Sequence, residues 1–419
     1  MPAPHTSSVW LLRSRRSCRC DSPPVMINML DGGAAAAPLR SSAFRRYLAG
    51  QLPSVTCSWA QVVALSWVVV KLDPHALGWI VVAQFLPSLA LGPWFGAVVD
   101  RHDRRRLLIF AEAGLGLVAL GYATALMAGV LTLPLIYALA SVWGVINALD
   151  TPARRALVPM LVPCEAAASA SALTGSVLVL GMAAGTALGG VLVTVAGAVV
   201  TFAVNAASFL GDVVVLASVR VGASPRVRRA PRQIRDGIVY VWRAPRLRAA
   251  MITLAIIATF AFTVQVSVPT LAEVGFDGGP ARIGAFFTAV TGGGVTGTLV
   301  FAARTRPKRR PFPRISLAMA AALFLTALSP YAWLAILGLA GVGFTWAYLL
   351  GNVLAILQTS DPRLMGRVMS LFALVLLGGT TVGGPLAADL AGVAGCRAPF
   401  ILGAGSAVIA AWLAPSSPV

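Results

Sequence analysis

Charged residues, and acidic residues in particular, are scarce in this 419-residue chain. Asp and Glu number 14 and Lys and Arg 33, so that charged residues make up 11% of the sequence, against roughly 25% in an ordinary soluble domain. Hydrophobic residues make up 58%, and the mean hydropathy is +0.83. This balance excludes a soluble enzyme, and it excludes a disordered chain because disorder needs low hydrophobicity.

Residues that carry enzyme chemistry or bind metal are also few. The only lysines are Lys71 and Lys308, and neither follows a glycine as an ATP-binding Walker A motif requires. The histidines, His5, His75 and His102, fall in expected tail or loop positions and form no H-E-x-x-H motif. The five cysteines are scattered and make no disulfide framework. We therefore expect no enzyme activity, no cofactor and no metal, and any energy coupling must use an ion gradient.

Long apolar runs dominate the chain, and most are of the length, about 17 to 25 residues, that crosses a bilayer. Six fall in the first part of the chain, at approximately 47–70, 78–99, 107–127, 131–148, 168–196 and 198–218. Six more follow at approximately 249–269, 284–303, 315–329, 333–357, 368–388 and 398–414. The sequence thus predicts an all-α polytopic membrane protein with twelve transmembrane helices.

The distribution of positive charge predicts the orientation of these helices. With the N-terminus inside, all but three of the 33 Lys and Arg residues are cytoplasmic, the exceptions being Lys71, Arg282 and Arg397. Positive residues gather in cytoplasmic loops, so both termini are expected to be cytoplasmic. The net charge of +19 then reflects topology, and we expect no nucleic-acid partner.

The segments between the runs suggest five regions. Residues 1–46 form a basic cytoplasmic tail, in which Met26 and Met29 are alternative starts. Residues 47–218 form the first six-helix half, and residues 249–414 form the second. Residues 219–248 form an Arg-rich cytoplasmic linker with a short surface helix from about Arg235 to Trp242, and residues 415–419 form a short cytoplasmic tail.

The two halves repeat weakly. Gly185-Thr186-Ala187-Leu188-Gly189-Gly190 recurs as Gly379-Thr380-Thr381-Val382-Gly383-Gly384. Asp100 and Arg104-Arg105-Arg106 after the second helix are matched by Arg304 and Lys308-Arg309-Arg310 after the eighth. Asp150-Thr151-Pro152 is matched by Asp361-Pro362. Three matches in one order indicate two six-helix pseudo-repeats, an architecture in which the substrate path lies between the repeats.

The most informative motif lies at the predicted cytoplasmic end of the second helix. It runs Gly92-Pro93-Trp94-Phe95-Gly96-Ala97-Val98-Val99-Asp100-Arg101-His102-Asp103-Arg104-Arg105-Arg106. It resembles the loop motif of the major facilitator superfamily, in the form of the enterobactin-exporter-like and macrolide-efflux-like branch. The segments 147–154, 205–209 and 366–371 look like the same branch, so the resemblance spans about residues 44–414.

The resemblance implies a conformational latch at this motif. Gly96 would allow a neighbouring helix to approach closely, and Asp100 would accept hydrogen bonds from a helix N-terminus. Arg101, Asp103, Arg104 and Arg105 complete the latch, which is made in one conformation and broken in the other. The inside-loop positions of the family's pattern are Asp150, Pro152, Arg154 and Arg367.

Glycines in the fifth and eleventh helices match an exporter-type motif of the family, although Thr186 stands where a proline is usual. They are Gly181, Gly185, Gly189 and Gly190 in one helix and Gly383 and Gly384 in the other. Close helix packing by small residues explains the same pattern without any exporter role.

Acids within the membrane are costly and are functional candidates. Glu112 and Asp212 are two such acids, and with Asp100 they are the candidates for proton coupling. The alternative is that Glu112 and Asp212 lie near the cytoplasmic end, paired with an arginine or reaching the interface.

The same resemblance implies a cavity between the halves with few polar groups. Its candidate residues are Gln61, Gln84, Phe85, Asn147, Gln265, Trp346 and Asn352. An apolar, aromatic pocket with a few amides suits a bulky neutral or amphiphilic compound. For each of these residues, packing or a lipid-facing position is an equal alternative.

Taken together, these features favour a secondary transporter of the bacterial inner membrane, acting as a monomer. It would export a drug, a siderophore or a specialised metabolite in exchange for protons, by alternating access. An uptake permease of the same fold and a non-transporting sensor or assembly protein are the alternatives.

Overall fold

The computed structural model describes residues 37–219, 234–304, 311–361 and 364–413, and every regular element within them is a helix. The predicted N-terminal tail lies outside the described residues up to position 36. The predicted C-terminal tail, 415–419, and the central part of the predicted linker, 220–233, also lie outside them.

The helices follow one another in two groups. The N-terminal half consists of α2 (Ser42–Leu72), α3 (Ala76–Arg101), α4 (Arg104–Met127), α5 (Leu133–Leu157) and α6 (Ala167–Ser218), with short 3-10 turns at Ala37–Arg40, Val158–Leu161 and Cys164–Ala166. Helix α7 (Ile234–Arg243) lies in the predicted linker, where a surface helix was expected. The C-terminal half consists of α8 (Pro245–Ile256), η5 (Ile257–Ala261), α9 (Val264–Thr270), η6 (Leu271–Gly275), α10 (Gly279–Ala302), α11 (Pro311–Leu328), α12 (Ala332–Leu357), α13 (Met365–Ala394) and α14 (Ala398–Leu413).

These helices account for twelve membrane crossings, so the predicted fold class is confirmed. Within the described residues, eight helical segments are long and apolar enough to span a bilayer, one of which is the combined α8–η6 segment. Helix α3 is a ninth, bent by 58° between Gly92 and Trp94. Helix α6 contains two crossings, residues 167–196 and 198–218, and the shorter apolar helices α11 and α14 complete the set.

Glycines make the tight reversals at matching places in the two halves. Gly197, between the two crossings of α6, has φ 83°, and Gly395, between α13 and α14, has φ 90°. Backbone with φ in this range is strained for a residue that carries a Cβ. The fifth-to-sixth and eleventh-to-twelfth connections are therefore built in the same way, as two pseudo-repeats require.

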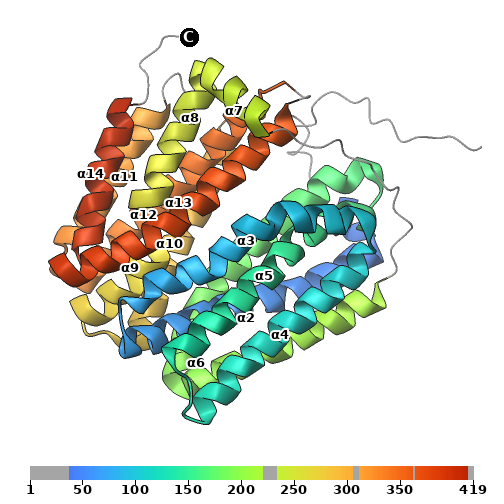
Figure 1. Cartoon of the computed structure of the whole chain (residues 1–419), viewed down its shortest axis with the longest axis horizontal. Helices are drawn as coiled ribbons and strands as arrows, with labels where there is room; N and C mark the ends of the chain where they lie inside the picture. Colours follow the sequence, from blue (N-terminus) through green and yellow to red (C-terminus); the bar gives the residue numbers. More distant parts are fainter. Residues whose placement is uncertain (1–36, 220–233, 305–310, 362–363, 414–419) are drawn as a thin grey trace, which may run out of the picture.

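Most packing lies within the halves. In the N-terminal half α2 packs on α6, α3 on α5, and α4 on both α5 and α6. In the C-terminal half α10 packs on α12, and α11 packs on α12 and α14. The main contacts between the halves join α6 to α10 and α3 to α13, and Figure 1 shows the two groups of helices meeting at one end and diverging toward the other.

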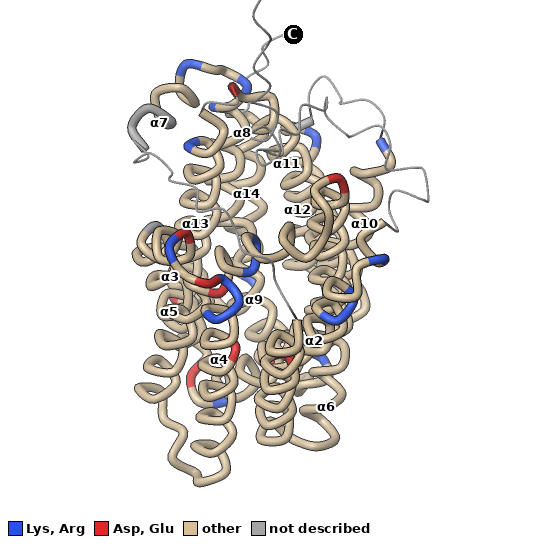
Figure 2. The backbone as a smooth tube through the Cα atoms, turned by 90° about the vertical axis from the view of Figure 1, so that its right-hand side faces the viewer, with Lys and Arg blue, Asp and Glu red and all other residues tan. Residues whose placement is uncertain are grey.

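The two ends of the bundle differ in charge. One end, which we call the basic end, contains the connection from α3 to α4, where Arg101 ends α3 and Arg104–Arg106 begin α4. Helix α7 lies at the same end. The opposite end, which we call the far end, has the short turns after α2 and at Gly197 and Gly395. Figure 2 shows Lys and Arg concentrated at helix ends and connections rather than along the helices.

Candidate functional site

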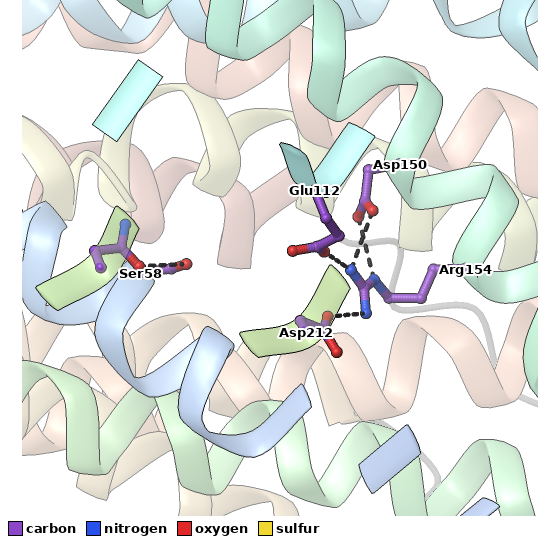
Figure 3. Close-up of polar contacts among 6 residues, drawn as sticks. Ser58, Glu112, Asp150, Arg154 and Asp212 are labelled. Atoms are coloured by element: carbon purple, nitrogen blue, oxygen red, sulfur yellow. Dashed lines mark hydrogen bonds and ion pairs between the residues drawn. The ribbon is translucent and has the colours of Figure 1, made fainter. Parts of the chain in front are cut away.

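One arginine within the N-terminal half holds three carboxyl groups from three helices. Arg154 Nη2 donates hydrogen bonds to Glu112 Oε1 of α4 and, at 3.1 Å, to Asp150 Oδ1. Its Nε donates to Asp150 Oδ2 at 3.2 Å, and its Nη1 lies 3.6 Å from Asp212 Oδ2 of α6. Figure 3 shows the guanidinium at the centre of these acids. We call these four residues the Arg154 cluster.

The cluster is buried and its hydrogen bonds are incomplete. Glu112 and Asp212 are 1% and 0% exposed, and the Arg154 side chain is 17% exposed. Glu112 Oε2 and both Asp212 oxygens have no hydrogen-bond partner among the described residues. Three ionised carboxylates facing one guanidinium would leave a net charge of about −2 in a site of low dielectric, which is costly. The cluster approaches neutrality when carboxyl groups hold protons.

The local sequence explains how the cluster forms. Asp150 and Arg154 are four residues apart on α5 and so lie on one helix surface. Gly50 of α2 makes room for the third acid, because a Cβ there would lie 2.5 Å from Asp212 Oδ1. The predicted place of Asp150, Pro152 and Arg154, after the end of a helix, is wrong. They lie in the last turns of α5, which stays helical after the apolar run ends because intrahelical hydrogen bonds need no apolar side chains.

The predicted latch residues divide into two groups. Asp103 caps α4, where its Oδ1 accepts hydrogen bonds from Arg105 N at 3.0 Å and Arg106 N at 3.4 Å. Arg105 donates to the carbonyl oxygens of Leu216, at 2.7 Å, and Ala217 at the end of α6. Arg104 donates to the Met160 sulfur at 3.0 Å. In this conformation these contacts of the three side chains lie within the N-terminal half.

The other latch residues lie near the end of α3, beyond its bend. Asp100 is half-buried and Arg101 is exposed, and neither forms an ion pair with another described residue. A Cβ built on Gly96 would meet no atom within 4 Å. Among the described helices, none therefore occupies the space beside Gly96. Arg367, predicted as an inside-loop position, lies in the first turn of α13.

The halves are in contact toward the far end. A Cβ on Gly78 of α3 would lie 2.7 Å from Gly384 O of α13, and one on Gly190 of α6 would lie 2.9 Å from Gly284 Cα of α10. Lys71 at the end of α2 forms an ion pair with Glu273 of η6. Toward the basic end, by contrast, Gly92 of α3 has open space where its Cβ would be.

A second seam between the halves is polar and includes the residue that departs from the family's pattern. Thr186 of α6 is fully buried, and its hydroxyl lies 3.3 Å from the hydroxyls of both Thr288 and Thr291 of α10. Neither partner stood out in the sequence, because isolated threonines in an apolar run carry no pattern.

The predicted packing glycines pack in two directions. Gly181, Gly185 and Gly189 face α2 of their own half; a Cβ on Gly189 would lie 2.7 Å from Ala60 Cα. Gly383 likewise faces Thr259 of η5 in its own half. The next residue in each helix, Gly190 or Gly384, faces the other half.

Two of the amides expected to line a cavity bond within the protein. Gln61 is buried, and its Oε1 accepts a hydrogen bond from Asn205 Nδ2 of α6 at 2.7 Å. Asn205 Oδ1 also accepts a hydrogen bond from Ser58 at 3.4 Å, a contact drawn in Figure 3. Asn352 is buried and donates to Tyr348 O of its own helix at 2.7 Å. Gln84, Phe85, Asn147 and Gln265 are half-buried.

An aromatic stack lies beside a break in the seventh crossing. The rings of Phe262 and Trp346 are 4.0 Å apart and nearly parallel. Helicity is interrupted at Phe262 and Thr263, between η5 and α9, so this crossing is irregular in the part of the helix where the stack lies. Irregular backbone inside a membrane is tolerated where it packs on protein or lines a cavity.

Among the described residues, no group of three or more His, Cys, Asp or Glu side chains is arranged to hold a metal ion. The three acids of the Arg154 cluster surround a guanidinium instead. The interactions observed at this site are therefore ion pairs and charge-assisted hydrogen bonds.

Comparison with known proteins identifies the family. The transmembrane secretion effector model of the major facilitator superfamily (MFS) matches residues 33–417. The chain is 26% identical over 366 residues to the multidrug efflux pump Tap of Mycobacterium tuberculosis, covering 81% of this chain and 85% of Tap. It is 25% identical over 271 residues to the uncharacterised MFS-type transporter YfiS of Bacillus subtilis, covering 62% of this chain and 63% of YfiS.

The fold has solved counterparts. A bacterial homologue of the human lysosomal transporter Spinster, solved in an inward-facing and occupied conformation, superposes with a TM-score of 0.70 at 14% identity and covers 90% of this chain and 96% of its own. The chain is a multi-pass membrane transporter rather than an enzyme, and it belongs to the transmembrane secretion effector family of the major facilitator superfamily.

Proposed function

We propose that this protein is a proton-coupled exporter of a bulky neutral or amphiphilic small molecule, such as a drug, a siderophore or a specialised metabolite. It works as a monomer in the bacterial cytoplasmic membrane, with both termini and the basic end inside. The name of Tap supports the outward direction, and the positive charge at the basic end supports the orientation.

The observation that carries the proton part of the proposal is the Arg154 cluster. Two of its acids are almost inaccessible to water, and their charge exceeds that of the single guanidinium. Buried carboxyl groups whose negative charge is not balanced by a nearby cation are the ones that change protonation when their surroundings change. Proton binding to Asp212 or Glu112 would weaken the ion pair of that acid with Arg154. The end of α5, which carries Arg154, would then be held less firmly.

The places where the halves touch support alternating access. With contacts toward the far end and open space beside Gly92 and Gly96, substrate enters from the basic end, between the halves. The Phe262–Trp346 stack and the half-buried amides of Gln84 and Gln265 form part of its binding surface. When the basic end closes, α3 approaches α13, and Asp100 accepts hydrogen bonds from the N-terminus of α13.

The test is the accumulation of lipophilic antibiotics, dyes and iron chelators in bacteria that lack their own pumps. Cells expressing the wild type are expected to accumulate less of at least one compound, and a protonophore is expected to abolish the difference. Asp212→Asn is expected to abolish it as well. Asp389→Asn, the same chemical change at an exposed acid of α13, is expected to leave it intact.

Other outcomes overturn the proposal. Higher accumulation on expression would make the protein an uptake permease. Unchanged accumulation of every compound, with the protein in the membrane, would favour a non-transporting sensor or assembly role. Efflux that survives both the protonophore and Asp212→Asn would show that protons do not drive transport through this cluster.

A further inference from the structure

A small cavity lies at the basic end of the C-terminal half, apart from the Arg154 cluster and the path between the halves. It has a volume of about 160 Å³ and lies among Arg304, which follows α10, the first turns of α11, and α12. Arg304 and Arg314 supply its charge, and Phe344 and Tyr348 supply aromatic surface.

The two arginines are placed to bind an anion. The Arg304 guanidinium lies over the Tyr348 ring, 4.5 Å from its centroid. Stacking on one face leaves the N–H groups at the edge of the guanidinium available, and their fork geometry matches phosphate. Arg314 of α11 lines the same cavity. Neither guanidinium has a hydrogen bond or ion pair with another described residue.

The helices around the cavity offer no counter-ion. Helices α10, α11 and α12 contain no Asp or Glu at all. Two unpaired cations beside an aromatic surface therefore meet no negative group of the elements that form the cavity. Among the described residues the cavity therefore carries an excess of positive charge, which suits an anionic ligand.

The position of the cavity favours one class of anion. Arg304 and Arg314 stand at the ends of membrane-crossing helices, the level at which phospholipid headgroups lie. Helix α11 packs on α12 and α14 of its own half, and its Leu317 side chain is 50% exposed, beside the exposed Ala318 at the cavity. A phosphate held by the arginines would thus place its acyl chains along the apolar outer surface of α11.

We propose that this cavity is a binding site for an anionic phospholipid of the leaflet at the basic end. Arg304 and Arg314 hold the headgroup phosphate, the Tyr348 ring fixes the Arg304 guanidinium, and the acyl chains lie against α11. The site is distinct from the path between the halves.

The test counts lipids on the purified, delipidated full-length protein by native mass spectrometry during titration with phosphatidylglycerol or phosphatidylcholine. The wild type is expected to bind one phosphatidylglycerol more tightly than phosphatidylcholine. Arg304→Gln and Arg314→Gln are each expected to weaken that first binding step roughly fivefold, the effect of about 1 kcal/mol per basic residue. The matched control is Arg246→Gln, which removes an exposed arginine from α8 at the same end and is expected to change nothing.

Two further variants separate the contributions. Tyr348→Phe keeps the ring under Arg304 and is expected to bind as the wild type does, whereas Tyr348→Leu is expected to bind more weakly. Equal losses with Arg246→Gln would overturn the proposal by showing a diffuse surface charge effect. So would displacement of the lipid by millimolar inorganic phosphate, which would indicate a site for free phosphate. Equal affinity for the two lipids would also overturn it.

Discussion

At the scale of single residues, Arg154 organises the polar interior of the N-terminal half. It contacts acids from α4, α5 and α6, and the ion pairs confirm the alternative in which Glu112 and Asp212 pair with an arginine near the basic end. Pairing and proton coupling are compatible, because a paired carboxyl that is short of hydrogen-bond donors is also one that a proton can neutralise.

Loss of Arg154 should destabilise the protein. Removing one partner of a buried ion pair leaves uncompensated charge and typically costs about 3–5 kcal/mol. Arg154→Gln is therefore expected to lower the midpoint of thermal unfolding of the purified protein, followed by fluorescence-detected size exclusion after heating. Arg155→Gln, at the exposed neighbouring position, should unfold as the wild type does. Equal loss of stability in both variants would contradict a structural role for the cluster.

Part of this cluster could be predicted from the sequence. Glu112 and Asp212 stand out because acids in apolar runs are rare. Arg154 was predicted only as an inside-loop position, because it follows the apolar run, and its pairing with these acids becomes visible only once α5 is seen to continue to Leu157. Gly50 is a small residue like many others in the chain, and its role depends on a contact with α6 that no pattern within α2 reveals.

At the scale of elements, adjacent glycines in the fifth and eleventh crossings pack against different halves of the protein. Gly189 and Gly383 fit these helices against their own half, and Gly190 and Gly384 fit them against the other half. The pairs occupy equivalent positions in the repeated segments. We therefore expect one residue of each pair to stabilise its own half and the next residue to stabilise the contact between the halves.

This division predicts different effects of one substitution at adjacent positions. Gly189→Val overpacks α6 against Ala60 within a half, which typically costs about 1–3 kcal/mol, and should reduce the yield of folded protein. Gly190→Val should fold normally but separate α6 from α10 toward the far end.

The separation can be measured by chemical labelling. In a variant without native cysteines that carries Thr288→Cys, we expect Gly190→Val to increase labelling by a membrane-impermeant maleimide applied from the far side. Labelling that Gly190→Val leaves unchanged would show that this contact does not hold the far end closed.

Sequence patterns predicted the approximate positions of the helices but not their bends and breaks. The first helix begins at Ser42 rather than at the predicted position 47, because Ser41 caps it by accepting a hydrogen bond from Phe44 N at 3.4 Å. The 58° bend of α3 and the break at Phe262 were not predicted. Apolar length shows that a segment crosses the membrane, but bends depend on the helices packed against it.

At the scale of the whole molecule, the halves are in contact at one end and diverge toward the other, an arrangement that fits one of the two conformations of the proposed alternating access. The halves join through Gly78–Gly384, Gly190–Gly284 and the Lys71–Glu273 ion pair. They diverge toward the basic end, as Figure 1 shows. The duplicated architecture was predictable from the repeats, whereas this conformation was not, because one sequence must encode both states.

The central claim is that the two ends open and close in opposite senses. It is tested most directly by spin-label distances in two double-cysteine variants without native cysteines. One variant carries Ala97→Cys in α3 and Met369→Cys in α13, and reports the distance near the basic end. The other carries Leu72→Cys and Val274→Cys, and reports the distance at the far end. On lowering the pH, or on adding a transported compound, we expect the first distance to shorten while the second lengthens. Two distances that stay fixed, or that change in the same direction, would contradict alternating access.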